Sequence, residues 1–140
     1  MRGINIQEQW AQRIYAGLKT IEARKYPLKR YKDELLWLIE TPDKPNSGKR
    51  RRTEITGVVR FGNDTEFSDY EEWRRDADKH CVPEGSTFDW NLSSKMFGWQ
   101  ITEVHKLRTP VQAPEKRGMI GCKAVERDVV YMNADLQQAR

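Results

Sequence analysis

The sequence has little cysteine and no long apolar run. Its 140 residues include two cysteines, Cys81 and Cys122, whereas small secreted domains held by disulfides usually have more. No run of about 18 apolar residues occurs, and the amino-terminal segment turns polar at once. These absences argue against a secreted disulfide scaffold and a membrane span, so we expect a protein of the reducing cytoplasm.

The sequence also lacks the motifs of common catalytic and metal sites. His80, Cys81, His105 and Cys122 do not have C-x-x-C or H-x-x-x-H spacing. There is no G-x-S-x-G, no phosphate-binding glycine-rich loop and no H-E-x-x-H. We therefore expect no cofactor and no obligatory metal.

Charge is abundant and unevenly distributed. Charged residues make up 33% of the chain and hydrophobic residues 37%, which is typical of one globular domain. The net charge of +4 is the sum of +7 over residues 1–60 and −3 over residues 61–140. Such an uneven charge distribution favours a polyanionic partner. Two solvated faces of different charge, without any such partner, would give the same distribution along the sequence.

Hydrophobic periodicity predicts a mixed α and β chain. The apolar stripe of residues 7–18 predicts a helix that Gly17 ends, and Ser68 is a candidate cap for a second helix through about Lys79. The expected strands are 3–6, 19–26, 35–39, 54–61, 97–107 and 121–130. Residues 42–52 and 82–91 are expected to be loops, and 134–140 a tail.

The segment after the first helix carries a recognisable motif. In Trp10–Arg24, Gly17, Lys19, Glu22 and Arg24 stand at the fixed places of a G-x-K-x-x-E-x-R pattern between a helix and a strand. The segment resembles the signature of the ASCH family. The resemblance implies one domain over residues 1–133, with a PUA-like fold, a small mixed α+β barrel with two or three helices. It also implies an association with RNA.

The motif residues suit a polar, planar ligand with a phosphate. On a strand that alternates, Thr20, Glu22, Arg24 and Tyr26 share one face. A carboxylate can accept hydrogen bonds from a base edge, an arginine can hold a phosphate, and a desolvated Lys19 can act as a base. We expect these residues to bind single-stranded RNA, a nucleotide or a nucleoside, and Glu22→Gln to weaken binding with little loss of stability.

Two other interpretations stay open at this point. Glu22 and Arg24 can form an internal ion pair with a purely structural role, in a domain that binds other proteins. Alternatively the chain is a metal-independent hydrolase, with Lys19 and Tyr26 as candidate catalytic residues. Some ASCH members cleave RNA, and others remove an acyl group from acetylated cytidine with a lysine and a threonine. Here Glu22 stands at the position of that threonine. Thr20, two residues earlier on the same face, is then the candidate for a nucleophile at a shifted position.

Aromatic and basic residues elsewhere extend the candidate site. Trp10 and Trp37 are expected in the core and Trp73 half-exposed on a charged helix. Trp90 and Trp99 are candidates for base stacking, although core packing is favoured for each. Two basic clusters are candidates for phosphate contacts: Lys29, Arg30 and Lys32, and the loop tip with Arg50, Arg51 and Arg52.

The loop tip gives a first test. Replacing Arg50, Arg51 and Arg52 with alanine should flatten the salt dependence of RNA binding, by about 0.7 in the logarithmic slope for each phosphate that the loop neutralises. Fluorescence anisotropy at several salt concentrations measures this slope. An unchanged slope would remove the loop from the interface.

Overall fold

The structure is a computed structural model that describes residues 1–43, 52–113 and the backbone of 119–121. In chain order the elements are as follows: β1 (Arg2–Gln7), α1 (Glu8–Tyr15), β2 (Ile21–Arg24), the 3-10 turn η1 (Lys29–Tyr31), β3 (Leu35–Thr41), β4 (Glu54–Glu66), α2 (Tyr70–Arg75), α3 (Ala77–His80), β5 (Phe97–Gln112) and β6 (Met119–Gly121). Over these ranges the predicted order of helices and strands is confirmed.

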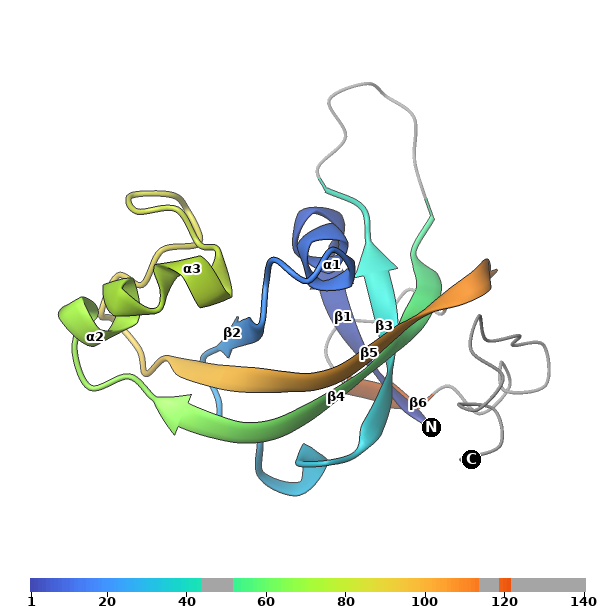
Figure 1. The fold of residues 1–140 in the computed structure, drawn as a ribbon, viewed down its shortest axis with the longest axis horizontal. Coiled ribbons are helices and arrows are strands. Elements are labelled where there is room, and N and C mark those ends of the chain that lie inside the picture. The colour runs from blue at the N-terminus through green and yellow to red at the C-terminus, as the bar shows by residue number, and fades with distance from the viewer. Residues whose placement is uncertain (44–51, 114–118, 122–140) are drawn as a thin grey trace.

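One mixed sheet organises the described part of the chain. Its strand order is β2-β5-β4-β3-β1-β6, with β1 parallel to β3 and the other pairs antiparallel. The long strands β4 and β5 curve together across the molecule (Figure 1). Shifts in their register account for the bending, since an extra residue in one strand increases its local twist.

Apolar side chains fill both faces of this sheet. Strand β3 is a continuous apolar run, and alternation sends Leu36 and Leu38 to one core and Trp37 and Ile39 to the other. The larger core also receives the predicted stripe of α1, with Trp10, Ala11 and Ile14 buried. Burial on both faces explains why β3 shows no polar alternation in the sequence.

The sheet does not close into a barrel among the described strands. Strands β2 and β6 stand at its two edges, so the mixed α+β class is confirmed but the predicted barrel is not. However, β2 lies across a gap from the end of β1, and a side chain bridges this gap. Arg24 Nη2 donates to the backbone oxygen of Asn5 at 2.7 Å.

Some local expectations were wrong. Asp69, not Ser68, caps α2, since its carboxylate accepts from the backbone N–H of Glu72 at 2.8 Å. The expected helix to Lys79 is broken at Asp76 into α2 and α3. Trp73, expected to be half-exposed, is fully buried, because α2 turns this side chain into the larger core.

Other expectations concern chain ends and loops. Gly17 ends the turn after α1 with a φ of +77°, as predicted. Residues 44–51 of the expected basic loop, residues 122–130 of the expected last strand and the expected tail at 134–140 lie outside the described residues. No helix in the described ranges is long and apolar enough to span a membrane.

Gly57 on β4 gives a test of the close packing of β4 against β5 and the end of α1. A β-carbon there would collide with the backbone oxygen of His105 and with the Tyr15 hydroxyl. We expect Gly57→Ala to lower the free energy of unfolding by about 1–3 kcal/mol in urea denaturation. Gly62→Ala on the same strand is the control, because its β-carbon would approach side-chain atoms of Thr102 and Gln100 and no backbone atom. Equal losses in both variants would contradict this packing.

Candidate functional site

A cleft of about 580 Å³ opens beside β2, between the end of β1 and the loop of residues 82–96. Three of its walls come from segments far apart in sequence. The predicted site residues Lys19, Glu22, Arg24 and Tyr26 all line this cleft. These four residues of the predicted cluster therefore come together in space, whereas Thr20 does not join them.

Lys19 is a buried cation held on several sides. Its side chain is 1% exposed, and Nζ donates to the backbone oxygen of His80 at 2.6 Å. The ammonium also lies 3.6 Å from Glu22 Oε1 and 5.1 Å from the centre of the Trp10 ring. Burial lowers the pKa of Lys19, and the Glu22 carboxylate offsets only part of that effect.

Glu22 is the shared partner of two cations. Its other carboxylate oxygen, Oε2, lies 2.9 Å from Arg24 Nη2, and the side chain is 7% exposed. Burial alone would raise the pKa of Glu22, but Arg24 and Lys19 outweigh it and hold the pKa below its usual value. Removing one member of a buried ion pair costs about 3–5 kcal/mol. We therefore expect Glu22→Gln to lower stability as well as binding, contrary to the expectation from the sequence.

Tyr26 stands at the rim of the cleft with its side chain accessible. The residue is 40% exposed, and its hydroxyl accepts a long hydrogen bond from Arg24 Nη1 at 3.4 Å. Trp99 supports it from below: the two rings pack edge to face at 5.4 Å, and Trp99 Nε1 donates to the backbone oxygen of Tyr26 at 3.1 Å. Trp99 itself is fully buried and does not line the cleft.

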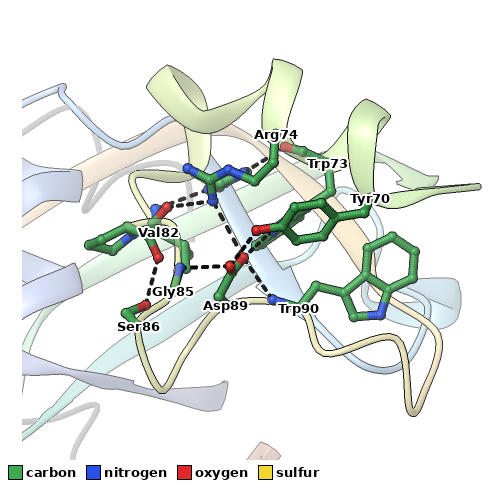
Figure 2. A network of polar contacts seen from close by, with 10 residues as sticks. Tyr70, Trp73, Arg74, Val82, Gly85, Ser86, Asp89 and Trp90 are labelled. Atoms are coloured by element: carbon green, nitrogen blue, oxygen red, sulfur yellow. Dashed lines mark hydrogen bonds and ion pairs between the residues drawn. The ribbon is translucent and has the colours of Figure 1, made fainter.

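The opposite wall is an irregular loop that is anchored by Asp89. Figure 2 shows donors converging on this carboxylate. They are the Tyr70 hydroxyl at 2.6 Å, Trp73 Nε1 at 2.8 Å, the backbone N–H of Gly85 and of Trp90 at 2.9 Å each, and Arg74 Nη1 at 3.4 Å. Burial by itself raises the pKa of Asp89, but these donors outweigh it and hold the pKa well below its usual range. The carboxylate thus fixes the loop to α2.

His80 connects the two walls. Its ring stacks on Trp73 at 3.7 Å, Nε2 lies 2.8 Å from the Trp73 backbone oxygen, and Nδ1 accepts from the Val82 backbone N–H at 3.0 Å. This pattern requires the neutral ring with its proton on Nε2. Burial also lowers the pKa of His80, so the residue acts as a neutral link whose backbone oxygen receives Lys19.

Sequence reasoning singled out only Trp90 in the loop wall, which lines the cleft but is buried, and missed Phe88 and the polar residues. Phe88 is 40% exposed and packs edge to face on Trp10 at 5.3 Å. Asn91 and Ser94 line the same wall. The Ser94 hydroxyl oxygen is buried and has no hydrogen-bond partner in the described part of the chain. No periodic pattern marks this loop in the sequence, so its aromatic content is the one signal that points to it, as it did for Trp90.

Several predicted site residues lie elsewhere. Thr20 precedes β2 and borders a separate hollow of about 440 Å³ with Lys79 and Gln100. Lys29 and Arg30 belong to η1, and Lys32 follows it; none of the three lines the cleft. Arg52 donates to the Gln112 side chain at 3.2 Å and faces an acidic hollow formed by Glu8, Glu40 and Glu54. Arg50 and Arg51 are outside the described residues.

The side chains that could ligate a metal are dispersed. Within residues 1–43 and 52–113, no group of three or more His, Cys, Asp or Glu side chains is placed to bind an ion. Cys81 is partly exposed and its thiol lies 3.3 Å from the Leu18 backbone oxygen. His105 pairs instead with Glu103 at 2.9 Å.

Comparison with known proteins identifies relatives of this fold. The model of the ASCH domain family matches residues 4–139. Crystal structures of ASCH from Zymomonas mobilis superpose with a TM-score of 0.63 at 13% identity, covering 98% of this chain and 90% of that one. A serine-to-alanine variant of that protein gives a TM-score of 0.62 at 14% identity, covering 99% of this chain and 92% of that one. A tyrosine-to-phenylalanine variant gives a TM-score of 0.63 at 13% identity, covering 99% of this chain and 94% of that one. No curated protein matches.

Asp89 yields a test that depends on pH. A group whose pKa is depressed by folding stabilises the protein above its unfolded pKa, near 4, and this contribution is lost as the pH falls. We expect Asp89→Asn to reduce the free energy of unfolding by about 2–3 kcal/mol at pH 7, with the deficit shrinking below about pH 4. Glu84→Gln in the same loop, which is exposed, is the control. A deficit that is independent of pH would show that Asp89 acts by packing alone.

Proposed function

The chain belongs to the ASCH domain family, and on this premise we propose that its cleft binds a nucleotide unit of single-stranded RNA. The family is associated with RNA in general. The observation that carries the proposal is the juxtaposition in one cleft of the Lys19–Glu22–Arg24 cluster and the accessible rings of Tyr26 and Phe88.

The polar cluster suits the edge and the phosphate of a nucleotide. A carboxylate offers about four acceptor positions, so the two cations leave Glu22 room to accept from a base amino group. Arg24 is 19% exposed at its side chain and can reach a phosphate with the part of its guanidinium that faces the cleft. The Ser94 hydroxyl, buried without a described partner, offers a further donor or acceptor on the facing wall.

The rings suit the flat face of a base. Tyr26 and Phe88 are each held by one edge-to-face contact, with Trp99 and Trp10 respectively, and each keeps 40% of its surface exposed. A ring that is fixed from behind loses little conformational entropy when a base stacks on it. Unpaired bases are available for such stacking, whereas bases in a duplex are not.

A hydrolase is the second candidate, and one observation favours it. Burial lowers the pKa of Lys19. A lower pKa increases the fraction of neutral amine, which is the form that can act as a general base. The position of Thr20 argues against a threonine-dependent amidohydrolase, because Thr20 borders a different hollow and not the cleft. The remaining possibility is hydrolysis of RNA or of acylated cytidine with Lys19 and Tyr26 as the reacting side chains.

One assay separates the two candidates. Purified protein is incubated with single-stranded RNA and, separately, with acetylated cytidine, without added metal, beside a Lys19→Ala variant. Saturable, salt-sensitive RNA binding without turnover is the expected result. Turnover that disappears in the variant would make the protein an enzyme, and absence of both binding and turnover would refute the proposal.

The stacking role of Phe88 can be measured directly. We expect Phe88→Ala to weaken RNA binding by about 5- to 150-fold, since base stacking contributes about 1–3 kcal/mol, and to change the melting temperature little because the ring is half-exposed. Leu92→Ala is the control: Leu92 lies in the same loop, is 59% exposed and does not line the cleft. Equal binding by both variants would exclude stacking on Phe88.

A further inference from the structure

A second cationic site lies outside the cleft, where β1 begins beside the turn η1. Arg2 Nη1 and Arg30 Nη2 both donate to the hydroxyl of Tyr31, at 3.3 Å and 3.1 Å. Their guanidinium carbons lie 5.6 Å and 5.2 Å from the centre of the same ring. One phenol therefore gathers two positive charges that come from different parts of the sequence.

Among the described residues, these two charges have no close counterion. In the ranges 1–43 and 52–113 neither Arg2 nor Arg30 forms an ion pair, and Glu34 acts on Arg30 only from beyond ion-pair distance. Two guanidinium groups on one oxygen repel each other. An oxyanion that accepts hydrogen bonds from both guanidinium groups would offset this repulsion with its negative charge. A phosphate suits this role, because the N–H groups of arginine match the spacing of phosphate oxygens.

The position of the cluster is set by the fold. Turn η1 is held by hydrogen bonds on both sides: the Leu28 backbone N–H donates to Asp64 at 3.0 Å, and the Asp33 backbone N–H donates to the oxygen of Phe61 at 2.8 Å. Tyr31 packs against the larger core. The guanidinium groups are thus collected on a rigid support before any ligand arrives.

The cluster also stands in a defined relation to the cleft. Arg2 and Asn5 lie on the same strand, and the backbone oxygen of Asn5 receives Arg24 from the cleft. Three residues of β-strand span about 10 Å. Strand β1 therefore connects the cluster to the candidate nucleotide site.

We propose that Arg2, Arg30 and Tyr31 form a phosphate site for the RNA backbone, which holds a strand whose neighbouring nucleotide occupies the cleft. This proposal rests on the proposed function. Phosphate contacts position a nucleic acid, whereas base contacts specify it. The cluster therefore supplies affinity and register without reading sequence, and the cleft supplies the selectivity.

The test compares ligands of increasing length. Oligocytidylates from the mononucleotide to the hexanucleotide, whose bases carry the amino group that Glu22 would accept from, are titrated by calorimetry against the full chain and against the double variant Arg2→Gln/Arg30→Gln. The matched control, Arg75→Gln/Arg108→Gln, removes two arginines that form no ion pair or hydrogen bond with side chains in the described ranges. Melting temperatures are recorded for each variant to verify that it folds.

The expected result is a loss that depends on length. The double variant should bind the mononucleotide as tightly as the unmodified chain does. In the unmodified chain the affinity should rise with strand length, and in the double variant this rise should be lost. Its logarithmic salt slope for the hexanucleotide should fall by about 0.7 for each phosphate that the two arginines neutralise. Tyr31→Phe should lose part of the same gain, because the ring remains but the oxygen that gathers the two arginines is removed.

Two outcomes would overturn the proposal. One is a double variant that matches the control in length dependence and salt slope. The other is a loss of mononucleotide binding as large as the loss for the hexanucleotide, which would mean a general effect of charge or of the cleft. A third outcome separates the two proposals. If neither the unmodified chain nor the variants bind the mononucleotide, but the affinity for the hexanucleotide still depends on Arg2 and Arg30, then the cleft proposal fails and the phosphate site stands.

Discussion

The buried carboxylate of Glu22 is the constraint on which the rest of the site depends. It lies between Lys19 and Arg24, and each cation in turn binds the backbone of another segment. Lys19 donates to the oxygen of His80 at the end of α3, and Arg24 to the oxygen of Asn5 on β1. A buried charge left without its partner is costly, so the three side chains keep β2, β1 and α3 together around the cleft.

The facing wall follows the same principle with a different anion. Asp89 gathers side-chain donors from α2 and backbone donors from its own loop. His80 stacks on Trp73, which donates to Asp89, while its own backbone oxygen receives Lys19. The two carboxylates are therefore mechanically linked through His80 and Trp73. A loop without secondary structure becomes a defined wall because the Asp89 carboxylate satisfies donors of both the loop and α2, which is the preorganisation that a binding site needs.

The open edge of the sheet lies beside the cleft. Strand β6 pairs with β1 at Arg2–Ile4, and β2 approaches β1 farther along without pairing with it. Arg24 bridges this gap with a side chain in place of a ladder of backbone hydrogen bonds. The cleft opens beside this bridge, and under the proposed function a nucleotide would occupy it. The proposed phosphate cluster at the start of β1 would then lie along the same strand.

The sequence by itself determined the features that repeat over short distances. The apolar stripe of α1, the continuous strand β3, the turn at Gly17 and the four motif positions all follow from spacing along the chain, because neighbours in a helix or strand have fixed relative directions. Only the tertiary structure decided which distant residues meet. It buried Trp73, separated Thr20 from the cleft, brought Phe88 and Ser94 to the wall that faces Glu22, and gathered Arg2 and Arg30 on Tyr31. These contacts join segments many residues apart, and no local periodicity records the register at which such segments pack.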